Sequence, residues 1–212
     1  MGLGSSFSPF KLNTMFSSKI LLVIMLPLFM SAASRHPQTV IRWAVQQNSN
    51  LSVHGSSNVN RFTCVIQSIG VCDTLFVTKN TGAAVALKGC LKLDVLAFNC
   101  HNNLIQKDLR KTLKAEQYPK MTIRFLSLKK MPTLTRQSEE ITGWVEVELA
   151  GTKKVMELNY SFLANAAGEI LLNGSRKFCF SDFSLAPPRK LAGLVKIRDE
   201  FDVQFQLVLK RI

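Results

Sequence analysis

Apolar and polar residues alternate along much of the C-terminal two thirds of the chain. "MTIRFLSL" from Met121, "WVEVEL" from Trp144 and "VMELNYSF" from Val155 place an apolar residue at every second position. The final stretch, "EFDVQFQLVLKRI" from Glu200, does the same from Phe201 to Leu209. Because successive side chains of a strand point to opposite faces of a sheet, this pattern predicts strands with one buried face.

The other apolar stretches are short and are separated by turn-forming residues. "NTG" at Asn80–Gly82 and "AGTKK" around Gly151 predict hairpins. Many short strands without intervening helices favour an all-β fold, an antiparallel sandwich or a barrel of about eight strands. A strand at the C-terminus favours the barrel, because the last strand can pair with the first and remove both edges. The remaining predicted strands are "TVIRWAV" from Thr39, "LSVHG" from Leu51, "NRFTCVI" from Asn60, "TLFVTK" from Thr74, residues 85–98 and "EILLNGSRKFCF" from Glu169.

One segment changes from this period to that of a short amphipathic helix. Asn103 can cap its start, and Pro119 ends it by Tyr118, because a proline disfavours helical backbone in the residue before it. The apolar face carries Leu104, Ile105, Leu109 and Leu113, with Asp108 beside them, and the opposite face carries Lys107, Arg110, Lys111 and Lys114.

The N-terminal residues 1–34 have the pattern of a secretory signal peptide. Lys11 and Lys19 precede an apolar run, residues 20–30, which is followed by small residues that predict cleavage near Ala33. The alternative is a membrane anchor, but the run is about half of the roughly 20 residues needed to span a bilayer. We therefore expect a domain over residues 35–212 that is periplasmic or secreted. Translation from Met15 would give a leader of ordinary length, so Met1 and Met15 are both candidate starts.

The formal net charge of +13 makes the chain strongly basic. Lysines and arginines are scattered through the predicted strands and the helix, and the aromatic residues do not interleave with them. This distribution argues against a nucleic-acid partner. It is compatible with a solvated basic surface or with transient contact with an anionic membrane surface.

The chain has five cysteines, so at least one cannot be paired within it. Export implies an oxidising compartment in which disulfides form. "RFTC" and "AFNC" each place a cysteine two residues after a phenylalanine, and we expect a disulfide between Cys64 and Cys100. No C-x-x-C and no paired histidine spacing is present, so free thiols are favoured over a metal site for the others.

The sequence carries none of the motifs that mark nucleophilic, metal-dependent or phosphate-binding catalysis. His36, His54 and His101 are the only side chains with an ordinary pKa near neutrality, and none lies in a recognisable catalytic motif. We expect a protein that is not an enzyme and has no cofactor. The apolar strand faces themselves leave two alternatives open, a packed core or a tunnel that holds one ligand.

The order of motifs resembles that of the YceI-like family of exported bacterial proteins, roughly from Trp43 to Leu209. Trp43 with "LSVHGSSNVNRF" is similar to the family's opening strands, and "DLRKTLKAEQYPKMTIRF" to its helix, Tyr-Pro and following strand. "RKFCFSDFSLAPP" and "VKIRDEFDVQFQL" resemble its closing strands. Gly143, Gly151, Thr152, Lys153 and Val155 match a hairpin motif of the family, and Asp182, Phe183 and Leu185 match a D-F-G-L pattern.

The sequence also departs from the family pattern. Ser184 stands where the D-F-G-L pattern has glycine, the aspartate and histidine that follow the family's first tryptophan are missing, and the cysteines are not general family features.

The resemblance implies an extended, lipocalin-like antiparallel β-barrel that binds a polyisoprenoid lipid. We therefore expect this protein to carry or store a long isoprenoid lipid, such as a polyprenyl or quinone chain. The alternative is a filled barrel with a structural or interaction role in the cell envelope and no lipid. The expected tunnel lining comes from the cleanest apolar faces and comprises Ile123, Phe125, Val145, Val147, Met156, Leu158, Tyr160, Phe162, Phe201, Val203, Phe205 and Leu207.

Overall fold

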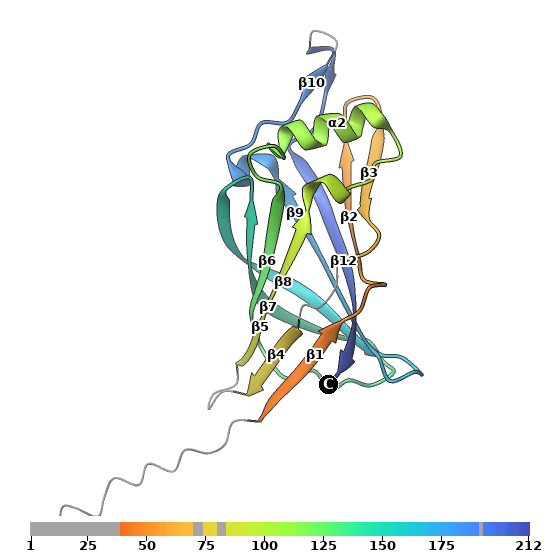
Figure 1. Cartoon of the computed structure of the whole chain (residues 1–212), viewed down its shortest axis with the longest axis vertical. Helices are drawn as coiled ribbons and strands as arrows, with labels where there is room; N and C mark the ends of the chain where they lie inside the picture. Colours follow the sequence, from red (N-terminus) through yellow and green to blue (C-terminus); the bar gives the residue numbers. More distant parts are fainter. Residues whose placement is uncertain (1–38, 70–73, 80–83, 191–192) are drawn as a thin grey trace, which may run out of the picture. The chain divides into compact units, whose positions relative to one another are not determined.

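Antiparallel strands curl into a closed barrel in the computed structural model (Figure 1). The structure describes residues 39–69, 74–79, 84–190 and 193–212. The predicted leader and its cleavage site, the turn at Asn80–Gly82 and Cys72 lie outside these residues. The barrel strands are β1 (Val40–Val45), β2 (Asn50–Ser56), β3 (Arg61–Ile66), β4 (Thr74–Lys79), β5 (Val85–Asp94), β6 (Lys120–Leu128), β7 (Glu139–Leu149), β8 (Thr152–Ala164), β9 (Ile170–Cys179) and β12 (Glu200–Arg211).

Eight of these strands complete the barrel, in the order β1-β4-β5-β6-β7-β8-β9-β12, and β12 pairs back onto β1. Closure of the last strand on the first is therefore confirmed. β12 pairs with β1 through Leu209–Arg211 and with β2 through Asp202–Gln206, so β1 and β2 share one edge of β12. The buried Ser49 occupies the break between them, where its Oγ donates to the Gln46 carbonyl and accepts from the Val208 amide.

β7 and β8 form the longest hairpin of the described sheet, as the alternation predicted. The turn between them contains Ala150 and Gly151, with φ angles of 49° and 80°. Successive positive φ angles match the twist of a two-residue hairpin. A Cβ at Gly151 would also lie 2.8 Å from the Tyr118 ring, so glycine is required there for space as well as conformation.

Several predicted boundaries are wrong at the end of the barrel where the helix lies. The strand expected over residues 85–98 ends at Asp94 and continues as the 3₁₀ helix η2 (Val95–Ala97). β9 likewise ends at Cys179 and is followed by η3 (Phe180–Phe183). Two short strands, β10 (Arg189–Lys190) and β11 (Val195–Lys196), pair antiparallel outside the barrel, and neither was predicted from the sequence.

The amphipathic helix is α2 (Asn103–Thr112), and it lies across one end of the barrel (Figure 1). Its cap is Asn102 and not Asn103, because the Asn102 carboxamide oxygen accepts from the amides of Leu104 and Ile105. Ile105 and Leu109 pack against the core, and Leu113 is buried just after the helix. Leu104, however, is 74% exposed, so its predicted place on the buried face is wrong. No helix in the described ranges is long and apolar enough to cross a membrane.

Candidate functional site

The barrel interior contains a cavity of about 60 Å³ directly beneath α2. Its wall is formed by strands and by the helices that cap the barrel, namely β2, β6, β7, β9, β12, α2 and η3. The cavity therefore lies at the capped end of the barrel. Every residue around it is apolar, namely Leu51, Val53, Phe98, Leu109, Leu113, Met121, Ile123, Val147, Leu149, Phe178, Phe180, Phe183, Phe201 and Val203. Such a cavity can hold hydrocarbon but offers no side-chain hydrogen bond.

Two smaller cavities adjoin this one on opposite sides. A cavity of about 40 Å³ lies between α2, the start of β3 and the loop around Pro188, and it shares Leu109 and Phe180 with the central cavity. A cavity of about 20 Å³ lies further inside the barrel and shares Ile123, Val147, Phe178 and Val203. The three cavities therefore form a row from the surface beside α2 into the barrel, separated only by side chains. We call this row the apolar track.

Phenylalanine rings form much of the wall of the central cavity. Phe178 stacks on Phe201 with ring centroids 5.9 Å apart, and Phe180 lies 4.7 Å from the same ring. Phe183 lies 6.1 Å from Phe178. These rings come from β9, η3 and β12, and all four line the central cavity.

The other end of the barrel is tightly packed. Phe125, Tyr160 and Phe205 form a triangle with centroid distances of 6.2 and 6.3 Å, and Phe162 joins Tyr160 to Trp43. Burial raises the pKa of the Tyr160 phenol well above its ordinary value, which keeps it neutral. This aromatic cluster closes the inner end of the apolar track.

The structure divides the twelve predicted lining residues between the track and the packed end. All face inward and are buried except Val203, which is half-buried. Ile123, Val147, Phe201 and Val203 line the central cavity, and Val145, Leu158 and Phe205 line the inner one. Phe125, Met156, Tyr160, Phe162 and Leu207 line none of the three cavities and contribute to the packed core.

Arg176 is a residue of the track that the sequence analysis missed. It occupies an inward register position of β9, opposite Val203, and lines the inner cavity. The β8–β9 ladder stops at Asn159 and Ser175, and the Arg176 guanidinium donates to the Glu157 carbonyl across the opening beyond. The signal was present in the sequence, because Arg176 interrupts an apolar series that runs through Leu172, Gly174 and Phe178.

The other missed residues of the central cavity form two groups. One group lies on strands and comprises Leu51, Val53, Met121, Leu149 and Phe178. The second group comes from non-strand segments around the cavity. Phe98, Leu109, Leu113, Phe180 and Phe183 belong to α2, η3 and the adjoining turns, where a two-residue period gives no information. Their apolar character was visible in the sequence, but their common location was not.

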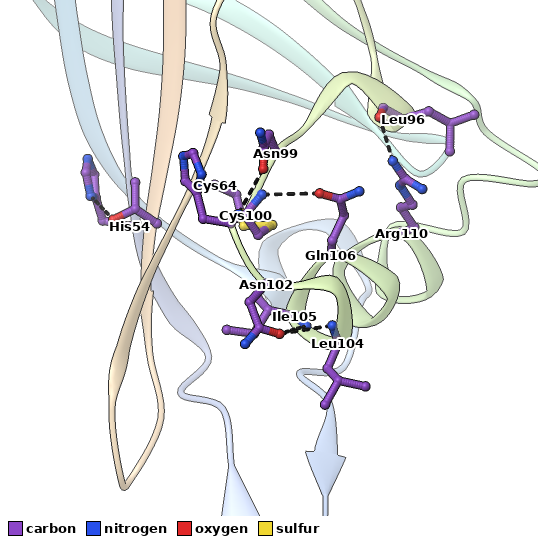
Figure 2. The surroundings of a disulfide bond; sticks show 12 residues. His54, Cys64, Leu96, Asn99, Cys100, Asn102, Leu104, Ile105, Gln106 and Arg110 are labelled. Atoms are coloured by element: carbon purple, nitrogen blue, oxygen red, sulfur yellow. Dashed lines mark hydrogen bonds between the residues drawn. A yellow bond between two sulfur atoms is a disulfide. The ribbon is translucent and has the colours of Figure 1, made fainter.

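A disulfide between Cys64 and Cys100, the pair favoured by the sequence, closes the gap between β3 and the segment that leads to α2 (Figure 2). Beside it, Val65 and Asn99 exchange two backbone hydrogen bonds of 2.8 and 2.9 Å. Arg110 of α2 then donates to the Leu96 carbonyl at 2.8 Å. These contacts tie α2 to the barrel and so hold the outer wall of the track in place.

The described polar groups give no sign of catalytic activation. The two ring nitrogens of His54 contact Ser52 and Thr63 hydroxyls on the outer face of the sheet. Partial burial raises the pKa of the Cys179 thiol, and Asp199 and Asp182 raise it further, which is opposite to what a nucleophilic thiol needs. Within the described ranges, no group of three or more potential ligands could hold a metal ion.

Comparison with known proteins adds the evolutionary context for this geometry. The YceI-like domain matches residues 38–209. The chain belongs to the YceI-like family. Two solved structures share the YceI-like fold with it, each at 16% identity and a TM-score of 0.59. One is a polyisoprenoid binding domain from Saccharophagus degradans implicated in plant cell wall breakdown, and the match covers 79% of this chain and 97% of that domain. The other is Burkholderia cenocepacia BcnA, and the match covers 77% of this chain and 98% of BcnA. No curated protein sequence matches the chain significantly.

Proposed function

We propose that this YceI-like protein binds a long isoprenoid lipid, a polyprenyl or isoprenoid quinone chain, and carries or stores it without chemical change. The observation that carries the proposal is the apolar track, whose central cavity is walled only by apolar residues and adjoins the surface beside α2. A neutral hydrocarbon chain matches these walls, whereas a polar substrate would lose its hydrogen bonds with water there.

The family and the fold support the same ligand class. The S. degradans relative, described as a polyisoprenoid binding domain, has 97% of its length covered by this fold. The proposal extends that binding property to this chain.

Binding requires the track to widen, because the volumes of about 60, 40 and 20 Å³ are small against the roughly 300–1,000 Å³ of ordinary ligand pockets. Leu109 and Phe180 separate the outer cavity from the central one, so rotation of these two side chains would join them. Removal of apolar area from water supplies roughly 25 cal/mol per Å², which offsets the cost of opening the track and ordering the chain.

The proposal also includes export. The predicted leader would place the domain in the periplasm or outside the cell, and the Cys64–Cys100 disulfide supports an oxidising compartment. N-terminal sequencing of the purified protein tests this part, with an N-terminus near Arg35 as the expected result and an intact leader as the contrary one.

A filled barrel with an interaction role is the second candidate. It is favoured by the tight packing of Phe125, Tyr160, Phe162 and Trp43, which leaves no cavity of the track at that end. A filled barrel predicts that natively purified protein contains no extractable lipid.

The test compares two valine-to-tryptophan variants expressed from the full chain. Val203 lines both the central and the inner cavity, whereas Val155 is 56% exposed on β8. Organic extracts of wild type and Val155→Trp are expected to contain an isoprenoid in a ratio near one per chain, measured by mass spectrometry. Val203→Trp should lose most of it, because the indole fills the track.

Circular dichroism and melting curves establish that both variants fold. A folded wild type with an empty extract contradicts the proposal and favours the filled barrel. Full lipid occupancy in folded Val203→Trp would show that the lipid binds somewhere other than the track.

A further inference from the structure

Exposed apolar side chains gather around the surface opening of the track. Leu104 at the start of α2 is 74% exposed, Leu194 just before β11 75%, and Val59 in the β2–β3 turn 66%. Asn58 joins the last two segments, since its side chain donates to the Leu194 carbonyl and accepts from the Lys196 amide, each at 2.9 Å. We call Val59, Leu104 and Leu194 the apolar tips.

Each apolar tip is close in sequence to a residue that lines the outer cavity. Val59 precedes Phe62, Leu104 precedes Ile105, and Leu194 precedes Ile197. α2, the β2–β3 turn and β10 also lie at the same end of the barrel (Figure 1). The tips therefore lie on three chain segments that each contribute to the wall of the outer cavity.

Cationic side chains accompany the tips. Lys107 and Lys111 are exposed on α2, and Lys196 and Arg198 are exposed on and after β11; within the described ranges none of the four forms a salt bridge. The carboxylate that lines the outer cavity, Asp108, is neutralised by Lys190 of β10 at 2.5 Å. The opening thus combines exposed hydrocarbon with uncompensated positive charge.

From this combination we infer that the α2 end of the barrel docks on an anionic lipid bilayer. The apolar tips insert at headgroup level, and the lysines of α2 lie against the anionic headgroups. The inference rests on the proposed function for the identity of the cargo. Its physical advantage is that an isoprenoid chain can pass from the bilayer into the track without exposing its whole length to water.

The docking is measured by flotation with vesicles that contain no isoprenoid, either phosphatidylcholine alone or phosphatidylcholine with phosphatidylglycerol at roughly 70:30, spanning the range of surface charge that attracts basic segments. Wild type should float with the anionic vesicles and dissociate as salt is raised. Lys107→Gln with Lys111→Gln should weaken binding on the order of 25-fold, from about fivefold per lysine. Leu104→Ser with Leu194→Ser should weaken it as well.

Matched controls change the same kinds of residue on the barrel wall. Lys88→Gln with Lys92→Gln removes two exposed lysines of β5, and Val155→Ser with Phe76→Ser removes two exposed apolar side chains. Both controls should bind within about twofold of wild type, since these residues lie outside the docking surface. All variants are expressed from the same full-length sequence and checked for the same N-terminus, so any contribution of the residues before β1 is equal among them.

Absence of binding to anionic vesicles at low salt would overturn the docking proposal. The docking proposal would also be overturned if Lys88→Gln with Lys92→Gln weakened vesicle binding as much as Lys107→Gln with Lys111→Gln. The attraction would then come from the net charge of the protein alone. Isoprenoid extraction is scored separately. Vesicle binding without extractable isoprenoid would support the docking surface and contradict the proposal that the protein binds an isoprenoid. Bound isoprenoid without vesicle binding would contradict only the docking proposal.

Discussion

At the end of the barrel that α2 covers, single residues make contacts that the alternating pattern does not predict. Arg176 has an inward register on β9, yet its charged group reaches the Glu157 carbonyl through the opening beyond the β8–β9 ladder. Leu104 has a helical apolar position, yet it is exposed. In both cases the position on the strand or helix could be predicted from the sequence. The burial and the contacts of the side chain depended on where the neighbouring segments end.

Asp94 gives a residue-scale prediction with a defined pH dependence. Its carboxylate accepts from the Leu96 amide at 2.9 Å and pairs with Lys120 at 3.0 Å. The Leu96 hydrogen bond, followed by Lys120, lowers the pKa of Asp94 below 3.8. Because the folded pKa is depressed, the stabilisation is present above the unfolded pKa and is lost as pH falls through the folded value. Asp94→Asn should therefore lower the Tm at pH 7, and the difference from wild type should shrink as the pH falls below 3.8.

The expected effect is below about 1 kcal/mol, since the pair is largely solvent-exposed. Thermal melts of both proteins across this pH range make the measurement. Glu116→Gln serves as the control, because among the described residues no salt bridge or side-chain hydrogen bond involves Glu116. A Tm difference for Asp94→Asn that stays constant down to pH 2 would contradict the electrostatic account.

At the scale of elements, a disulfide and hydrogen bonds connect the short segments at the end of the barrel that α2 covers. The disulfide between Cys64 and Cys100 closes a separation of 36 residues, and Arg110 fixes α2 to the η2 segment. α2 has only ten residues and no fully buried one, so it depends on these links more than on its own packing. The strands, in contrast, are stabilised by long ladders.

Replacing both linked cysteines tests this dependence. Cys64→Ala with Cys100→Ala should lower the free energy of unfolding by about 2–4 kcal/mol, the range expected from loop-closure entropy. Amide hydrogen exchange should accelerate in α2 more than in the β7–β8 hairpin. Cys90→Ala with Cys179→Ala is the matched control, because both are free thiols within the part of the chain that the structure describes. Equal acceleration of exchange throughout the barrel would show that the disulfide does not act locally on α2.

The whole molecule combines a packed barrel end with a loosely filled one. The aromatic cluster around Tyr160 packs ring against ring, and the three cavities of the apolar track lie between this cluster and the segments around α2. This division favours widening of the apolar track beside α2, while the strands of the remaining barrel keep their hydrogen-bonded pairing. A ligand bound only by the folded state must then also raise its stability.

Added polyprenyl alcohol should therefore raise the melting temperature of delipidated protein. At a ligand concentration of 100 times Kd the gain is about 2.7 kcal/mol, or roughly 5–10 °C for a chain of this size. Scanning calorimetry at matched detergent concentration makes the measurement, with Val203→Trp as the unresponsive control. An equal shift in both proteins would indicate a detergent or surface effect and contradict binding in the track.

The choice of a barrel over a sandwich rested on the C-terminal position of the last strand and on the resemblance to the YceI-like family. The amino-acid pattern by itself determined an antiparallel all-β fold and the existence of one short helix. These features follow from local periods and turn residues, which are properties of consecutive positions. The inward face of each long strand was also predictable, including all twelve proposed lining residues. Only the tertiary structure decided which inward residues border space and which fill it. That outcome depends on where ladders stop, as at Asn159 and Ser175, and on how α2 and η3 pack over the end. Alternation specifies a face of a strand, whereas a cavity arises from side chains of distant segments that do not completely fill the volume between them.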